Sequence, residues 1–252
     1  MLDVTAQQSV LVLPTYNEIE NLELFIRQVR KFCPLLHVLI VDDDSPDGTG
    51  HAADRLATEL GDLEVIHRVG ERGLGSAYRA GFAHLSGKLF DVVVTMDADF
   101  SHDPAVIPRF LNAIQSGADV VIGSRYVSGG DIRGWPLYRQ LLSRWGNAYT
   151  RWVLQLESRD CTSGFRAYKY RALIDINPAN EHGEGYVSLT ALIRRAQQNN
   201  LRIVEMPITY TNRIQGISKM SWRIILESML LVTVLGAKDA FIRLCKHFRR
   251  AT

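Results

Sequence analysis

The sequence predicts an α/β fold in which helices flank both faces of a mostly parallel sheet, followed by a C-terminal apolar or amphipathic helix. Two observations carry this prediction. Short apolar runs alternate with segments of helical spacing, which is the order of βαβ units. The apolar runs are nearly continuous, as expected of strands that are buried on both faces. With 252 residues, 46% of them hydrophobic, the chain can bury the core of one large domain.

The first half of the chain alternates regularly. Apolar runs predict strands at Val10–Leu13, Val38–Val41, Leu63–Arg68, Val92–Met96 and Val120–Gly123. Pro14 ends the first of these runs, and an Asp/Pro/Gly turn, Ser45-Pro46-Asp47-Gly48, follows the second. Apolar residues at helical spacing predict helices at Asn21–Phe32, Gly50–Leu60, Ser76–Leu85 and Pro104–Gln115.

The second half is less regular. Helical spacing predicts helices at Leu137–Leu154 and Tyr186–Gln197. A strand opens at Ser163-Gly164-Phe165, and Ile203–Tyr210 is strand-like. Pro207 lies inside that last run, so it predicts a bulge or an edge strand.

The C-terminal segment differs from the rest, which predicts a main domain of residues 1–222 and a separate segment of residues 223–252. Ile224–Ile242 is mostly apolar, and its longest charge-free stretch, Ser228–Ala237, is too short to span a bilayer, which needs about 20 residues. Basic residues follow it: Arg243, Lys246, His247, Arg249 and Arg250. An apolar helix with a basic end suits an anionic membrane surface. A core helix, a partner-binding helix and a solvated tail are the alternatives.

Composition excludes several classes of protein. The net charge of +2 gives no overall field for a nucleic acid polymer. The three cysteines are far apart and show no ligand spacing, so neither a zinc site nor a disulfide framework is expected, and a reducing, cytosolic setting fits. The N-terminus is short and polar, with no signal peptide.

The most informative motif is the pair Asp97 and Asp99, which ends the apolar run Val92–Met96. Residues i and i+2 of a strand point the same way, so the two carboxylates can converge. Two like charges that close are unfavourable unless a cation lies between them, and oxygen ligands favour Mg²⁺ or Mn²⁺. In open α/β sheets, ligands bind outside the carboxyl ends of strands. The alternative is a solvated turn that caps the helix beginning at Pro104.

Other strand ends carry candidate ligands. Asn17, in Pro14-Thr15-Tyr16-Asn17-Glu18, suits either a nucleotide or a helix cap, and Asp43 suits either a nucleoside or a turn. Arg72-Gly73-Leu74-Gly75 lacks the spacing of a dinucleotide fingerprint or a P-loop. Arg125 and Arg139 could grip a phosphate, or pair with carboxylates.

Together these runs resemble family 2 glycosyltransferases of the GT-A (Rossmann-like) fold, and more narrowly the dolichyl- or polyprenyl-phosphate mannosyltransferases without a transmembrane domain. The resemblance extends from Ser9 to Lys219. The matching residues are Pro14-Thr15-Tyr16-Asn17-Glu18, Val41-Asp42-Asp43, Arg72-Gly73-Leu74-Gly75, Met96-Asp97-Ala98-Asp99, Gly123-Ser124-Arg125-Tyr126, Asp160, Ser163-Gly164-Phe165-Arg166 and Ser218-Lys219.

The resemblance implies a GDP-mannose donor, a polyprenyl (dolichyl) phosphate acceptor and a Mg²⁺ or Mn²⁺ cofactor. It implies the following roles: Pro14, Tyr16, Glu18 and Asp43 at the nucleoside, Asp97 and Asp99 on the metal at the pyrophosphate, Arg213 and Lys219 near the phosphates, and Arg125, Arg139 and Ser143 at the acceptor phosphate. Asp99, Arg125 and Arg139 would be the catalytic residues. Ser101 stands where some relatives carry a Gln as third metal ligand, and its shorter hydroxyl would reach the ion through water.

The implied reaction is an inverting transfer that gives polyprenyl β-mannosyl phosphate. The enzyme would lie peripherally on the cytoplasmic face of a membrane, with room for a partner subunit that anchors it. The alternatives are a polyprenyl-phosphate glucosyltransferase that uses UDP-glucose, a non-catalytic nucleotide-sugar-binding subunit, and a glycosyltransferase for a soluble acceptor.

Overall fold

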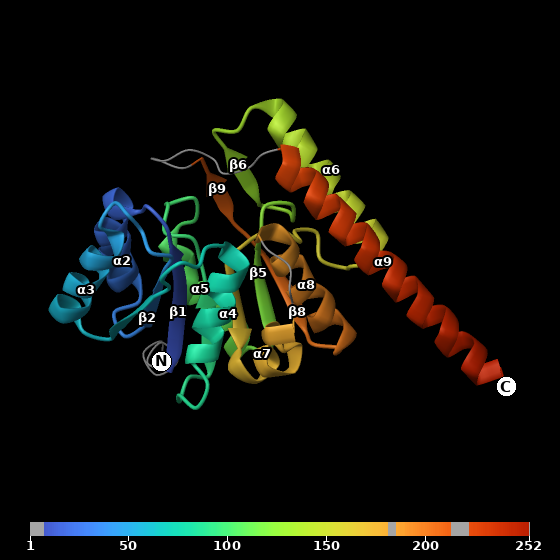
Figure 1. Ribbon diagram of the computed structural model, residues 1–252, viewed down its shortest axis with the longest axis horizontal. Helices are drawn as coiled ribbons and strands as arrows, with labels where there is room; N and C mark the ends of the chain where they lie inside the picture. Colours follow the sequence, from blue (N-terminus) through green and yellow to red (C-terminus); the bar gives the residue numbers. More distant parts are fainter. Residues whose placement is uncertain (1–7, 181–184, 213–221, 252) are drawn as a thin grey trace.

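The computed structural model describes residues 8–180, 185–212 and 222–251, and its centre is a seven-stranded sheet (Figure 1). The strand order is β3-β2-β1-β4-β7-β5-β8. The strands are β1 (Ser9–Thr15), β2 (His37–Asp42), β3 (Leu63–His67), β4 (Val92–Thr95), β5 (Val120–Ser124), β7 (Arg166–Lys169) and β8 (Ile203–Pro207). All neighbouring strands are parallel except β7, which runs against both β4 and β5.

Helices cover both faces of this sheet, as predicted. They are α2 (Ile19–Phe32), α3 (Thr49–Leu60), α4 (Leu74–His84), α5 (Ile107–Gln115), α6 (Leu137–Leu154), α7 (Tyr170–Ile176), α8 (Gly185–Gln198) and α9 (Trp222–Ala251), with short 3₁₀ turns at Pro104–Val106 and Pro178–Asn180. Alternate strand residues feed two cores: Leu11 packs with α2, α3 and α5, while Val10 packs with α4, α7 and α8. Burial on both faces explains why the strands read as continuous apolar runs.

The second half departs from the predicted pattern in several places. The strand expected at Ser163 begins at Arg166 and is antiparallel, so the loop before it reaches the edge where β4 and β5 end. The run Ile203–Tyr210 is two strands: β8, an edge strand that contains Pro207, and β9 (Thr209–Thr211). Strand β9 pairs with β6 (Asp131–Arg133) in a small second sheet. Neither β6 nor α7 was predicted.

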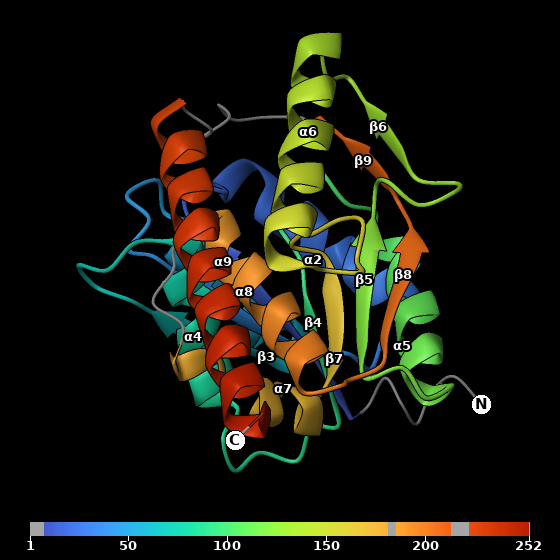
Figure 2. The same cartoon turned by 90° about the vertical axis from the view of Figure 1, so that its right-hand side faces the viewer.

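Helix α9 lies beside α6 and α8 (Figures 1 and 2). Val232 and Gly236 are buried on its inner side, and the Asp239 carboxylate accepts a hydrogen bond of 2.6 Å from Arg194 Nε of α8. Large apolar side chains such as Phe241, 67% exposed, lie on its outer side. One side of the predicted C-terminal helix therefore packs on the domain. No helix of the described residues has the length and apolar character that a membrane crossing requires.

Helices α6 and α9 are in close contact at Gly236, which gives a first prediction. A Cβ atom there would lie 2.4 Å from Val153 Cγ1 and 3.0 Å from the Val153 carbonyl oxygen. We expect Gly236→Ala to loosen α9 from α6, because backbone cannot yield as a flexible side chain does, and to raise the hydrogen exchange of α9 peptides. Gly146→Ala on α6 is the matched control, since its Cβ would meet nothing within 4 Å. Equal exchange in the two variants would contradict this packing.

Candidate active site

The sheet reverses its winding between β1 and β4, and the predicted donor ligands follow these two strands. The chain proceeds from β1 outward to β2 and β3, and then returns to add β4 on the other side of β1. Such a switch point opens a crevice at the carboxyl ends of the strands. Pro14–Glu18 and Asp97–Asp99 lie at these ends. The structure therefore brings these two predicted runs to one edge of the sheet.

Strand β4 ends at Thr95, one residue before the predicted end, and Asp97 and Asp99 lie in the segment that follows it. The convergence expected from strand alternation stays a prediction. Asp99 is only 2% exposed, and its carboxylate accepts a hydrogen bond of 3.0 Å from the Ser101 backbone N–H. Asp97 lies against the loop before β7, where a Cβ on Gly164 would be 3.6 Å from Asp97 Oδ1.

Unsatisfied polar atoms gather around these aspartates. Among the described residues, seven buried side-chain N or O atoms have no hydrogen-bond partner, and four of them belong to Tyr78, Ser101, His102 and Ser163. Buried polar groups are nearly always paired in a protein, so such a group of orphans marks a ligand site. Burial lowers the pKa of His102 to about 4, although the charge of Asp99 opposes this, so the imidazole is neutral near pH 7.

A divalent cation fits this arrangement. Asp97 and Asp99 supply carboxylate oxygens, and the orphaned Ser101 Oγ is a neutral oxygen beside them. No cluster of three or more His, Cys, Asp or Glu side chains suited to a metal occurs within the described ranges. Substrate phosphate oxygens and water would complete the shell, as is usual for Mg²⁺.

The turn after β2 is tied to the start of α2 by hydrogen bonds. The backbone N–H groups of Asn17, Glu18 and Ile19 donate to Ser45 Oγ, Thr49 Oγ1 and Asp47 Oδ2, so the turn after β2 caps α2. The cap residue is therefore not Asn17, the alternative that the sequence left open.

Two of the predicted nucleoside ligands already have protein partners. The Asp43 carboxylate accepts from Arg68 Nη1 at 2.7 Å and from the Gly73 backbone N–H at 2.9 Å, which ties β2 to the Arg72–Gly75 loop. The Arg72 guanidinium lies 4.7 Å from the centre of the Tyr16 ring, a cation–π contact. The nucleoside roles of Pro14, Tyr16, Glu18 and Asp43 remain predictions.

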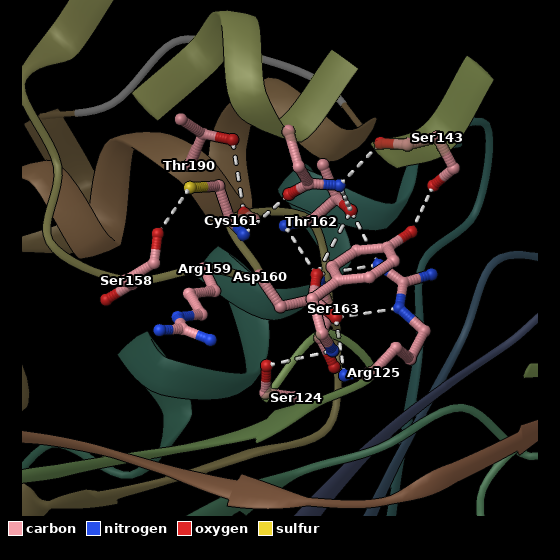
Figure 3. A network of polar contacts seen from close by, with 12 residues as sticks. Ser124, Arg125, Ser143, Ser158, Arg159, Asp160, Cys161, Thr162, Ser163 and Thr190 are labelled. Carbon is pink, nitrogen blue, oxygen red and sulfur yellow. Dashed lines mark hydrogen bonds and ion pairs between the residues drawn. The ribbon is translucent and has the colours of Figure 1, made fainter. Parts of the chain in front are cut away.

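Arg125 is the centre of a buried network (Figure 3). Its Nε and Nη2 donate to the two carboxylate oxygens of Asp160, each at 2.7 Å, and its backbone N–H donates to Asp160 at 3.0 Å. Burial would raise the pKa of Asp160, but the Arg125 guanidinium outweighs it and holds that pKa below its ordinary value. Of the two possibilities that the sequence left open for Arg125, the structure shows the pairing with a carboxylate, and this pair is buried. The role of Arg125 at a phosphate stays a prediction.

The other predicted acceptor residues lie near this network. Ser143 Oγ is 2.7 Å from the hydroxyl oxygen of Tyr126, the residue that follows Arg125 in the sequence. The guanidinium of Arg139 lies 4.1 Å from the centre of the Trp135 ring, and that of Arg125 lies 6.0 Å from the same ring. The structure therefore brings Arg125, Arg139 and Ser143 together around Trp135 and Tyr126. Arg213 and Lys219 lie outside the described residues.

Sequence reasoning missed the residues that position these groups. No pattern in the sequence indicated a role in the site for Arg68 or Trp135. Asp160 was given only as one of the residues that match the family, with no role of its own, yet it anchors Arg125. Arg166, which is fully buried, donates to the carbonyl oxygens of Cys161, Ser163 and Leu189, and so fixes the loop before β7.

Known proteins match this chain along most of its length. Residues 10–176 match the family described as Glycosyl transferase family 2. The chain is 45% identical over 238 residues to polyprenol monophosphomannose synthase of Mycolicibacterium smegmatis, covering 94% of this chain and 90% of that protein. It is 45% identical over 228 residues to undecaprenyl-phosphate mannosyltransferase of Micrococcus luteus, covering 89% and 92%. Dolichol-phosphate mannosyltransferase of Pyrococcus furiosus is 37% identical over 223 residues, which cover 86% of this chain and 60% of that protein.

Solved structures share the fold. Glucosyl-3-phosphoglycerate synthase from Mycobacterium tuberculosis, in complex with phosphoglyceric acid, has a TM-score of 0.66 at 20% identity, covering 92% of this chain and 82% of that one. Mannosyltransferase PcManGT from Pyrobaculum calidifontis, in complex with GDP-Man and Mn²⁺, has a TM-score of 0.60 at 18% identity, covering 92% and 64%. These likenesses confirm the predicted fold class. Since the family match spans more than half of the chain and the relatives are similar over nearly all of it, the chain belongs to glycosyl transferase family 2.

Proposed function

We propose that this protein transfers mannose from GDP-mannose to a polyprenyl phosphate, with inversion, to give polyprenyl β-mannosyl phosphate. The observation that carries the proposal is 45% identity over 94% of the chain to a polyprenol monophosphomannose synthase. The site supports it, because the switch point carries two carboxylates while Arg125, Arg139 and Ser143 lie together on neighbouring elements.

The chemistry needs few groups from the protein. A divalent cation, Mg²⁺ or Mn²⁺, held by Asp97 and Asp99 would neutralise the charge that develops on the leaving pyrophosphate. Pro14, Tyr16, Glu18 and Asp43, which follow the neighbouring strands, would orient the nucleoside. A phosphate monoester has a second pKa of about 6, so the acceptor is already anionic and needs no general base. Direct attack by an oxygen of the acceptor phosphate inverts the anomeric carbon of the α-linked mannose.

Arg139 offers a cleaner test of acceptor binding than Arg125, since Arg125 also has a structural role. We expect Arg139→Ala to raise the acceptor KM roughly tenfold or more, because a hydrogen bond to a charged group is worth about 1.5–3 kcal/mol. Arg139→Lys should be impaired as well, since an ammonium lacks the planar fork. Steady-state kinetics with both substrates varied is the measurement. A large change in the KM for GDP-mannose, with none for the acceptor, would contradict the assignment.

A radiolabel assay tests the whole proposal. The purified protein is incubated with a short polyprenyl phosphate and either GDP-[¹⁴C]mannose or UDP-[¹⁴C]glucose, with Mn²⁺, with Mg²⁺ or with EDTA. We expect labelled lipid only from GDP-mannose and only with a divalent cation. Transfer from UDP-glucose alone would establish the glucosyltransferase instead. Absence of transfer from either donor, with GDP-mannose still bound, would favour a non-catalytic binding subunit.

The proposal includes a peripheral position on the cytoplasmic face of a membrane. Helices α6 and α9 lie side by side (Figure 1) and expose apolar residues at the same spacing. These are Leu137, Leu141, Trp145 and Trp152 on α6, and Leu226, Leu230, Val234 and Phe241 on α9. Trp152 is 79% exposed. Amphipathic helices of this kind lie in the membrane interface, and a lipid acceptor requires contact with one. A membrane-anchoring partner subunit is the competing occupant of this apolar face.

The apolar face gives a prediction. Replacing Trp145, Trp152 and Leu230 by Gln should release the protein from vesicles, because each large apolar side chain that leaves water contributes about 1.5–3 kcal/mol. Vesicle flotation is the measurement. The matched control replaces Val69 and Leu89, which are 77% and 96% exposed elsewhere, by Gln. If the two variants float alike, the apolar face contacts a protein partner or none.

A further inference from the structure

A cavity of about 450 Å³ opens between α6, the end of β5 and the loop before β7. Arg144, Asn147 and Arg151 line it from one side of α6, Arg125 from the end of β5, and Arg159 from the loop. Its volume is in the range of small-molecule sites. Four arginines around one cavity are a concentration of positive charge that needs a counter-charge.

Among the described residues, Asp160 supplies a counter-charge to Arg125, and the other three arginines of the cavity have none. No carboxylate among the described residues forms an ion pair with Arg144, Arg151 or Arg159, and the buried Arg151 Nε has no hydrogen-bond partner there. In Figure 3 no dashed line reaches the Arg159 guanidinium within the described chain. Asp160, the nearest acid in the chain, is engaged by Arg125, and the Glu205 carboxylate accepts from the backbone N–H groups of Arg159 and Asp160. The cavity is therefore positive as it stands.

The cavity extends away from the predicted acceptor residues. Arg151 lies eight residues beyond Ser143 on α6, which corresponds to roughly 12 Å along the helix axis. Arg125 and Tyr126 belong to both regions. Arg139 and Ser143 do not line the cavity, so an anion held by Arg151 and Arg159 would be additional to a phosphate held by Arg139 and Ser143.

We propose that this arginine cavity binds the phosphate of an anionic phospholipid headgroup. The proposal rests on the membrane contact proposed above, and it follows from the order of residues on α6. Arg144 precedes Trp145, and Arg151 precedes Trp152, so two of the four cavity arginines are next in sequence to a tryptophan of the apolar face. With the tryptophans in the interface, the arginines lie at headgroup level. Guanidinium groups bind phosphate bidentately.

Vesicle binding tests the proposal. The variant Arg144→Gln/Arg151→Gln/Arg159→Gln is compared with Arg55→Gln/Arg109→Gln/Arg171→Gln, which removes the same charge from exposed arginines on α3, α5 and α7. The probes are vesicles of phosphatidylcholine, alone or mixed with phosphatidylglycerol. Each basic residue at an anionic surface contributes about fivefold in affinity, so the cavity variant should lose roughly a hundredfold on the mixed vesicles. Equal losses in the two variants would overturn the proposal.

Calorimetry with soluble ligands identifies the source of the phosphate. We expect dihexanoyl phosphatidylglycerol to bind wild type and control alike, and single cavity variants roughly tenfold more weakly. If inorganic phosphate binds but the short lipid does not, the lipid assignment is wrong. Should the triple variant fail to fold, Arg159→Gln alone, on an exposed loop residue, gives the same comparison.

Mannosyl transfer to a short, water-soluble prenyl phosphate separates this proposal from the proposed function. The cavity variant should keep wild-type kinetics in that assay, and a raised acceptor KM would instead assign the cavity to the acceptor. If wild type transfers no mannose, the proposed function fails while both binding measurements still decide the phospholipid proposal.

Discussion

Replacing Asp99 by Ala is expected to remove nearly all mannosyl transfer while leaving the fold intact. Asp99 is 2% exposed at the end of β4, in the group of unsatisfied polar atoms. Loss of one charged metal ligand removes several kcal/mol of transition-state stabilisation, and about 4 kcal/mol corresponds to roughly a thousandfold in rate. Transfer measured across a Mn²⁺ titration, with circular dichroism to confirm the fold, is the test.

A matched control lies four residues along the chain. Asp103 is exposed, and its carboxylate caps the turn at Pro104 by accepting from the Ala105 backbone N–H at 2.9 Å. Asp103→Ala should cost about 1 kcal/mol of stability and little activity. An active Asp99→Ala protein, together with full wild-type turnover in excess EDTA, would show that no metal is held there.

Asp160→Asn is expected to lower the free energy of unfolding by about 3–5 kcal/mol, because it leaves the Arg125 charge buried without its partner. The pair is almost completely removed from water, with side chains that are 6% and 0% exposed. Urea denaturation is the measurement. The control is Asp131→Asn, which breaks an exposed pair with Arg133 and should leave stability nearly unchanged.

The double variant Arg125→Met/Asp160→Asn separates structure from catalysis. Removing both charges should recover part of the stability that Asp160→Asn loses, since no buried charge remains unpaired. Transfer should stay low if Arg125 also binds the acceptor phosphate. Recovery of stability and transfer together would mean that Arg125 serves only the fold.

The parallel part of the sheet could be predicted because burial on both faces makes a strand uniformly apolar. Strand β7 reads Arg-Ala-Tyr-Lys, and its direction is set by pairing with β4 and β5 rather than by its own residues. The three-residue strands β6 and β9 form by pairing with each other, and the paired residues Asp131 and Thr209 are 78 positions apart in the sequence. Such pairings have no local signal in a sequence.

The candidate site likewise combines residues that a local sequence pattern predicts and residues whose partners are distant in the sequence. Asp97 and Asp99 could be found because two carboxylates directly follow an apolar run. The partner of Arg125 lies 35 residues away in the chain, and that of Asp43 lies 25 residues away at Arg68. Only the folded chain shows which acids are already engaged by the protein.

Because β7 runs against its neighbours, the loop before it arrives at the ligand edge from the second half of the chain. Among the described residues, those proposed to hold the nucleotide sugar and its metal thus fall between Pro14 and Ser101, and those proposed to hold the acceptor fall between Arg125 and Ser143. Arg213 and Lys219, predicted near the phosphates, lie outside the described residues. The two halves share the sheet through the pairing of β4 with β7. Substitutions in one half of the chain can therefore change the preference for the donor or for the acceptor while the other preference is kept. Chimeras of related enzymes joined after Ser116, in the turn between α5 and β5, would combine the donor of one parent with the acceptor of the other.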